Sequence, residues 1–141
     1  NASISGAAGG CQAEVGSASG MAAASIVALA GGTPQQSATA MAIALKNLLG
    51  LVCDPVAGLV EVPCVKRNAM GAAIAMVAAD MSLAGITSTI PCDEVIEAMF
   101  RIGQTMPTAL RETALGGLAA TPTGKRLKQE IFGQSAAADS E

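Results

Sequence analysis

Three cysteines of this 141-residue sequence have neighbours that suit them to holding a metal group. Cys11 follows a cluster of glycines, Cys53 lies in a Cys-Asp-Pro sequence, and Cys64 follows Pro63. Glycine and proline keep the backbone beside a cysteine open, so nearby amides can hydrogen-bond the sulfur atoms of a cluster. We expect Cys11 to open a helix, and helix N-termini favour the thiolate form. Iron–sulfur binding is one chemistry that these residues suit.

The spacing of these cysteines leaves two interpretations open. Structural zinc sites usually have four protein ligands with close pairs such as C-x-x-C, whereas these cysteines are spread from position 11 to position 64 and the chain has no histidine. Three thiolates without an obvious fourth ligand suit a cluster that leaves one iron open. Buried cysteines with no ligand role are also common, and spacing alone favours them. We expect Cys92, beside Asp93, to be a buried or capping thiol.

Composition excludes several classes of function. Charged residues make up 13% and apolar residues 51% of the chain, which argues against disorder. The net charge of -3, the lack of a basic run and the near absence of aromatic residues argue against nucleic acid as a partner. The apolar runs are too short to span a membrane, and no segment has the features of a secretory signal. We therefore expect a cytoplasmic protein with no membrane partner.

The remaining pattern predicts an all-α fold whose alanine-rich helices pack closely. Thr33 and Pro34 are suited to the N-cap and the first position of a helix that runs to about Leu49. Met70 and Met81 lie on one apolar face of a later helix, and we expect the methionines to fill the core. Further helices are expected over 11–30, 66–84, from Thr89 or Pro91 onward, 107–113 and 122–132. An irregular loop is expected over 50–64, and the domain is expected to span 1–132, with a flexible tail at 133–141.

The cysteine motifs also carry a resemblance to a known family. The segments GCQAEVG (10–16), LVCDPVAGLV (51–60) and VPCVKRNAMG (62–71) closely resemble the α chain of bacterial iron–sulfur L-serine dehydratase. The segments LRET (110–113) and GGLA (116–119) resemble it too. The likeness runs along nearly the whole chain and falls on the C-terminal half of longer α chains. Because the sequence opens with Asn1 and not with Met, we expect the chain to start inside a larger protein.

The resemblance implies a 4Fe-4S cluster held by Cys11, Cys53 and Cys64, with Cys92 outside the ligand set. It implies conversion of L-serine to pyruvate and ammonia, a separate β chain as partner, and a homo- or hetero-oligomer. The fourth iron would act as a Lewis acid on the β-hydroxyl of the substrate. Since clusters with an open iron are oxygen-labile, we expect a structure determined in air to lack the group.

Several further residues are assigned roles as expectations. Arg67 and Asn68 are expected to orient the substrate carboxylate, and Asp54 to cap its own loop. Arg111 and Glu112 are expected to form a structural ion pair rather than to line the site.

The catalytic base is expected outside this chain, because histidine is absent. Pyridoxal phosphate is not expected, because lysines such as Lys46, Lys66 and Lys125 have no accompanying phosphate-binding loop. Two alternatives remain: a cluster-dependent enzyme that eliminates hydrogen sulfide from cysteine, and a helical interaction domain with inert cysteines.

Overall fold

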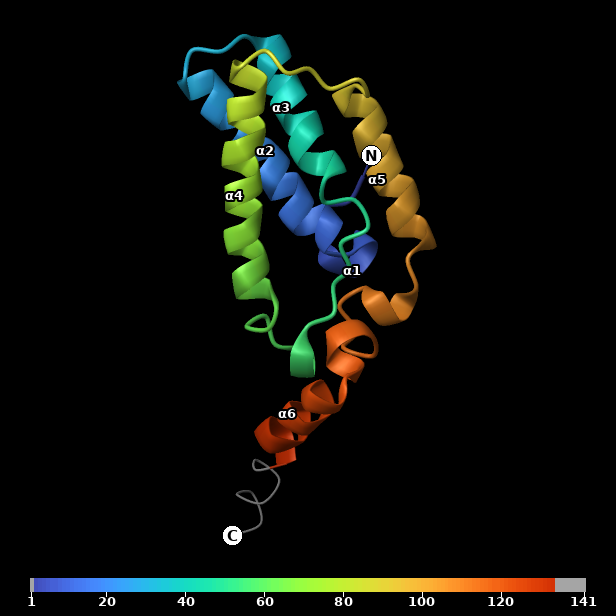
Figure 1. Cartoon of the computed structure of the whole chain (residues 1–141). Coiled ribbons are helices and arrows are strands. Elements are labelled where there is room, and N and C mark those ends of the chain that lie inside the picture. The colour runs from blue at the N-terminus through green and yellow to red at the C-terminus, as the bar shows by residue number, and fades with distance from the viewer. Residues whose placement is uncertain (1, 134–141) are drawn as a thin grey trace.

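The computed structural model describes residues 2–133, which form helices joined by turns and one long irregular loop (Figure 1). The main helices are α2 (Ser17–Leu29), α3 (Pro34–Lys46), α4 (Cys64–Leu83), α5 (Cys92–Thr105) and α6 (Pro122–Gly133). Shorter elements are the single turn α1 (Gly6–Gly9), the π-helix η1 (Gln12–Gly16) and the 3-10 turns η2 (Val56–Gly58), η3 (Thr108–Leu110) and η4 (Gly117–Ala120). No strand occurs in this part of the chain, so the predicted all-α class is confirmed.

The start of α3 is the best-defined helix end, and the sequence predicted it. Thr33 Oγ1 accepts a hydrogen bond from the Gln36 backbone N–H at 3.2 Å, and the Gln36 side chain accepts one from the Thr33 N–H at 2.9 Å. This reciprocal pair satisfies two amides that the helix leaves free. The helix ends at Lys46, earlier than the predicted Leu49, because the chain tightens into turns that end at Gly50 with φ +82°.

The core of the bundle is built from small side chains, as expected. The helices α2, α3 and α4 lie side by side (Figure 1). Their shared buried cluster consists of Ala23, Val27, Ala40, Ile43, Ala44, Ala75, Ala78 and Ala79. A second cluster, in which Leu45 of α3 meets Val95 and Met99 of α5, attaches α5 to the other side of α3. Alanine allows the helix axes to approach closely, and this fixes the bundle on which the cysteine-bearing loop is mounted.

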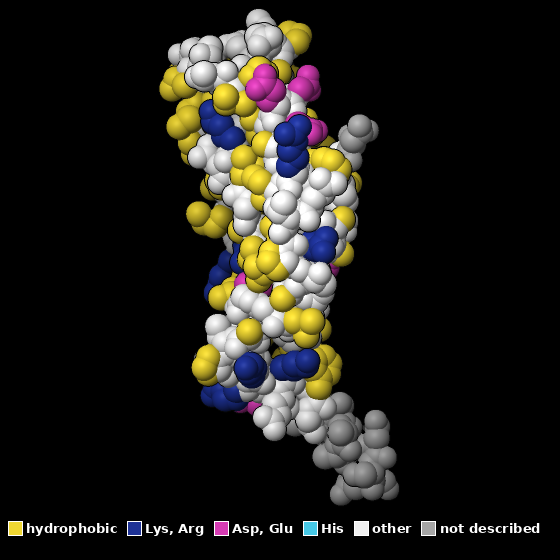
Figure 2. All heavy atoms as spheres, turned by 90° about the vertical axis from the view of Figure 1, so that its right-hand side faces the viewer, with side chains coloured by type: hydrophobic (Ala, Val, Ile, Leu, Met, Phe, Trp, Pro, Cys, Tyr) yellow, Lys and Arg dark blue, Asp and Glu magenta, His cyan; other side chains and the backbone are white. Residues whose placement is uncertain are grey.

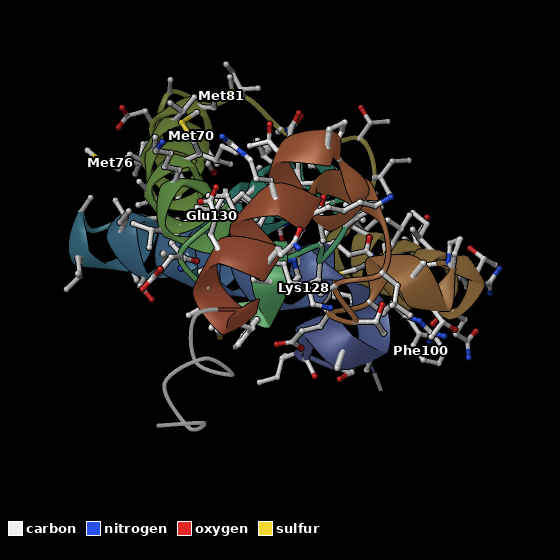
Figure 3. All side chains as sticks on the ribbon, turned by 90° about the horizontal axis from the view of Figure 1, so that it is seen from below. Met70, Met76, Met81, Phe100, Lys128 and Glu130 are labelled. Carbon is white, nitrogen blue, oxygen red and sulfur yellow. The ribbon has the colours of Figure 1, made fainter. Side chains whose placement is uncertain are left out.

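The predicted inward face of α4 is wrong. The buried residues of α4 are Gly71, Ala75, Ala78, Ala79 and Ser82. Met70 is 64% exposed and Val77 is 53% exposed. Figure 3 shows the side chains of Met70, Met76 and Met81 along the surface of α4. The reason is the close approach of the helices, which leaves room for methyl groups and none for a thioether chain. Only Met99 and Met106 are buried, whereas Met21, Met70, Met76 and Met81 are exposed and do not fill the core as predicted.

One further predicted helix is confirmed and another differs from the structure. The helix expected over 11–30 is an unbroken helical run to Leu29, in which the π-helix η1 continues directly into α2. The helix expected over 107–113 is reduced to the turn η3, because Glu112 and Ala114 have φ values of +64° and +55°. The final helix, α6, agrees with the prediction to within one residue and includes Gly133. The rest of the predicted tail lies outside the described residues.

On the face that carries α5, basic side chains are scattered from top to bottom (Figure 2). The acidic side chains on it gather near the start of α5, where Asp93, Glu94 and Glu97 lie close to Arg101. Asp93 and Glu94 stand in the first turn, where the helix dipole favours negative charge. Among residues 2–133, no helix combines the length and the apolar character needed to cross a membrane.

Candidate metal centre

The structure brings the three predicted ligand residues to one cavity at the lower end of the bundle. Cys11 and Cys53 are buried, with 2% and 3% exposure, and Cys64 is half-buried at the first position of α4. The cavity has a volume of about 280 Å³. Its lining comprises Cys11, Glu14, Val15, Cys53, Pro55, Val60, Cys64, Val65, Asn68 and Glu112. Cysteines that are far apart in the sequence therefore face the same space.

Glycines ahead of Cys11 allow the backbone to pack against the cavity, as the sequence indicated. Gly10 has φ +77°, and a Cβ there would lie 2.9 Å from the Leu51 carbonyl oxygen and 2.6 Å from Met106 Sδ. A Cβ at Gly6 would lie 3.1 Å from Cys53 Sγ. Larger residues at these positions would push the cysteine loop away from the helix, so glycine is required for the close approach.

The loop that carries Cys53 is held by backbone hydrogen bonds to a distant segment. The Cys53 N–H donates to the Leu110 carbonyl at 2.9 Å, and the Glu112 N–H donates to the Cys53 carbonyl at 2.8 Å. This single parallel pairing fixes the position of the Cys53 backbone beside the cavity. It also explains the left-handed conformation of Glu112, which turns the chain away directly after the pairing.

A buried ion pair lies beside the cysteines. Arg67 Nη1 donates to Asp54 Oδ1 at 2.7 Å and to the Val52 carbonyl at 2.8 Å, and it lies 3.8 Å from Cys11 Sγ. The second carboxylate oxygen of Asp54 accepts a hydrogen bond from the Leu118 N–H at 2.7 Å. Asp54 thus caps a segment far along the chain and not its own loop, which corrects the prediction for this residue.

The surroundings of the cavity raise the pKa of two of its thiols, Cys53 and Cys64. Burial raises the pKa of Cys53 far above its usual range, and Cys11, Glu112 and Cys64 raise it further. Burial and then Cys11 raise the pKa of Cys64, with partial opposition from Arg67. Burial alone would lower the pKa of Arg67, but Asp54 outweighs it and holds this pKa above its ordinary value. Metal binding at these thiols would release protons, since thiolate is the form that ligates.

Comparison with known proteins places this geometry in a family. The model of the family described as serine dehydratase alpha chain matches residues 1–119. The chain belongs to the serine dehydratase alpha chain family. A probable L-serine dehydratase alpha chain of Bacillus subtilis is 84% identical over 133 residues, which cover 94% of this chain and 44% of the relative.

Two further relatives support the family assignment. A probable L-serine dehydratase alpha chain of Latilactobacillus sakei is 66% identical over 139 residues, covering 99% of this chain and 66% of that protein. The L-serine dehydratase alpha chain of Peptoniphilus asaccharolyticus is 54% identical over 131 residues, covering 93% of this chain and 45% of that protein. The chain therefore spans between about two fifths and two thirds of the length of these serine dehydratase relatives.

Two carboxylates of this serine dehydratase family member line the cavity: Glu14, to which the sequence assigned no role, and Glu112, which was expected to lie outside the site. Glu14 and Glu112 both line the cavity, and their Oε2 atoms lie 3.1 Å and 3.5 Å from the position that a Cβ would take at Gly6. No ion pair joins Glu112 to Arg111 in the described part of the chain, so that prediction is wrong. Glu14 was discoverable, because it lies one helical turn after Cys11 within the same motif.

The other predicted residues divide between the cavity and the rest of the fold. Asn68 lines the cavity, whereas Arg67 is not among the lining residues. Cys92 does not line the cavity: it is half-buried and packs against the cluster of Leu45, Val95 and Met99, and burial followed by Asp93 raises its pKa. This agrees with the prediction of a buried thiol at the start of α5.

Proposed function

We propose that this chain is the cluster-binding part of an iron–sulfur L-serine dehydratase, which converts L-serine to pyruvate and ammonia. The observation that carries the proposal is the convergence of three cysteines, from three separate segments, on one cavity. The names of the relatives, which are L-serine dehydratase alpha chains, support the substrate and the reaction. The complete enzyme is proposed to include a β chain, to be oligomeric and to be cytoplasmic, where thiols stay reduced.

The donor set fits a 4Fe-4S cluster better than a single metal ion. Within residues 2–133, no three His, Cys, Asp or Glu side chains are arranged around one ion position. Three thiols around a space of about 280 Å³ leave room for a group of several atoms, and thiolates are the ligands of iron–sulfur clusters. Cys11, Cys53 and Cys64 would hold the cluster. When bound, it would supply a Lewis-acidic iron that assists departure of the β-hydroxyl.

The chain's own residues would bind and orient the substrate. Asn68 lies in the cavity wall, and its amide can donate to the carboxylate of an amino acid. Glu14 and Glu112 carry negative charge that complements the α-ammonium group. Val60 and Val65 contribute apolar surface at the exposed rim of the cavity. Arg67, expected from the sequence to share the role of Asn68, has its Nη1 engaged by Asp54 and Val52.

The proton at the substrate α-carbon is proposed to be taken by a base outside this chain. Histidine, the most frequent general base, does not occur in the sequence. The β chain or the part of the α chain beyond these residues would supply it. Neither departure of the β-hydroxyl assisted by iron nor proton removal by this base requires pyridoxal phosphate.

Anaerobic reconstitution of the complete α chain with iron and sulfide, in the presence of the β chain, tests the proposal. We expect visible absorption of a cluster, iron and sulfide bound in equal amounts, and pyruvate formed from L-serine. Sulfide released from L-cysteine in preference to pyruvate from serine would replace the proposed reaction with desulfidation. A chain that binds no iron would leave only a helical interaction domain with inert cysteines.

A further inference from the structure

One guanidinium nitrogen meets all three segments that carry the cysteines. Arg67 Nη1 lies 3.8 Å from Cys11 Sγ, and it donates to the carbonyl of Val52 and the carboxylate of Asp54, the residues on either side of Cys53. Arg67 itself stands in the first turn of α4, one turn after Cys64. Its contacts therefore link the start of η1, the irregular loop and the start of α4 at a single atom.

This ion pair has a buried carboxylate and a half-buried guanidinium, unlike the exposed pairs in the described part of the chain. The side chains of Arg67 and Asp54 are 18% and 3% exposed. The pair Arg101–Glu97 is 74% and 52% exposed, and the pair Arg126–Glu130 is also largely in solvent. Exposed pairs contribute little to stability, whereas removing one member of a buried pair leaves an uncompensated charge. Arg67–Asp54 is thus the pair whose loss the surrounding structure cannot absorb.

Asp54 extends the link to the end of the domain. Its Oδ2 accepts the Leu118 N–H at 2.7 Å, and the backbone of Gly117, with φ +58°, packs so closely on this carboxylate that a Cβ would overlap it. Both carboxylate oxygens therefore accept hydrogen bonds, one from Arg67 of α4 and one from the Leu118 amide of η4. Movement of Asp54 would disturb both sides of the cavity at once.

We propose that the Arg67–Asp54 pair is a positioning device that holds the three cysteines in place for the cluster before the cluster is bound. The loop over 50–63 contains only the short turn η2, and three neighbouring thiols give it no attraction of their own. The pair adds a side-chain link to the backbone pairing of Cys53 with Leu110 and Glu112, because one cation contacts a carbonyl, a carboxylate and a sulfur together. Arg67 is then a positioning residue and not a substrate contact. The cluster-holding role of the cysteines rests on the proposed function, whereas their placement by Arg67 does not.

The test measures cysteine accessibility in the complete α chain without a cluster. Each cysteine is labelled with a thiol reagent, and mass spectrometry gives the rate at each position. We expect Arg67→Met to raise the rates at Cys11 and Cys53 about tenfold, because the loop opens locally more often. Arg101→Met, which removes a cation from an exposed pair, is the matched control and leaves both rates unchanged.

Two further variants keep the test decisive if Arg67→Met fails to fold. Arg67→Lys retains the charge but places it on a compact ammonium at the end of a different side chain, so we expect weaker contacts and intermediate labelling rates in a folded protein. Asp54→Asn retains the shape and loses the charge. In the double variant Arg67→Met/Asp54→Asn, we expect little more labelling than in either single variant, because both remove the same link.

The rate of iron loss to a chelator gives a second comparison between the variants and the parent protein. After anaerobic reconstitution, a chelator should remove iron from the Arg67→Lys protein several times faster than from the parent protein. Wild-type labelling rates at Cys11 and Cys53 in folded Arg67→Met or Arg67→Lys protein, together with a raised KM for serine, would overturn the positioning role and restore a substrate contact. A parent protein that binds no iron would instead refute the proposed function, while the labelling rates would still decide the positioning role.

Discussion

The two ends of the bundle are stabilised in opposite ways. Where α2, α3 and α4 pack together, the core is apolar and made mainly of alanine. The helices there are regular, and α3 has a capped start at Thr33. Around the cysteines, the chain is irregular, contains a π-helix and left-handed residues, and is tied by a buried ion pair. The first region depends on the volume of side chains, and the second depends on a few polar contacts between distant segments.

Because of this difference, the residues that stabilise the bundle are largely distinct from the residues that line the cavity. A close-packed alanine core tolerates little added volume but carries no chemistry. The cysteine end has polar and thiol groups whose placement is needed for binding, and it contributes less apolar burial. Substitutions can therefore be chosen to damage one region and leave the other intact, and their effects differ in kind as well as in size.

The largest effect is expected at the cysteines. Cys53→Ser in the complete enzyme should abolish stable iron binding and pyruvate formation, because a buried hydroxyl is a poor substitute for a thiolate ligand. The thermal midpoint of the cluster-free chain should change little. Iron content and the pyruvate assay measure the first effect, and calorimetry measures the second. Cys92→Ser is the matched control and should retain iron, so loss of iron in both variants would contradict the separation of Cys92 from the site.

The next effect concerns the core alone. Ala75 is 1% exposed on α4, and Ala75→Leu should lower the free energy of unfolding by about 1–3 kcal/mol through overpacking. Ala72→Leu, on the exposed side of the same helix, should change it by less than about 0.5 kcal/mol. Denaturant unfolding of both variants measures the contrast. Equal destabilisation by the two leucines would mean that the exposed side of α4 is covered in the complete protein.

A smaller effect is expected for a carboxylate of the cavity. Glu112→Gln should raise the KM for L-serine about tenfold, equivalent to about 1.4 kcal/mol, with kcat changed less, because the variant loses attraction for the α-ammonium group. Steady-state kinetics of the reconstituted enzyme measure both constants. Iron content should equal that of the parent. A collapse of kcat at unchanged KM would instead identify Glu112 as the base. That result would contradict the proposal that the base lies in another part of the enzyme.

The smallest effect is expected at the helix cap. Thr33→Ala removes the side-chain acceptor for the Gln36 N–H and should cost about 1 kcal/mol of stability. Thr33→Ser keeps the hydroxyl and should recover most of that loss. Thermal unfolding gives the difference, and the cysteine labelling rates should stay the same in both variants. A change in those rates would show that the two ends of the bundle are coupled.

The sequence predicted local structure well and long-range placement poorly. The cap at Thr33 and Pro34 and the start of α5 near Pro91 were predictable, because their signals lie within one helical turn. The gathering of Cys11, Cys53 and Cys64 was inferred from the resemblance of their motifs, since spacing alone favoured inert thiols.

What the sequence could not predict depends on residues that are distant along the chain. The methionine face of α4 matched the period of a buried stripe, but alanines on its neighbours selected the opposite face. One hydrogen-bond partner of Asp54 is the backbone amide of Leu118, and a backbone amide cannot be recognised as a partner from the residue types in a sequence. Glu112 enters the cavity only because its segment pairs with Cys53.

That pairing also sets an order of events during synthesis. Proteins emerge from the ribosome N-terminus first, so Cys11, Cys53 and Cys64 are all exposed to the cell before the segment over 110–118 has been made. Until then, Cys53 lacks its two backbone partners and Asp54 lacks the Leu118 amide. The cavity is therefore completed only after the last of these residues has left the ribosome. Any group that needs all the walls of the cavity can therefore bind only after the segment over 110–118 has emerged.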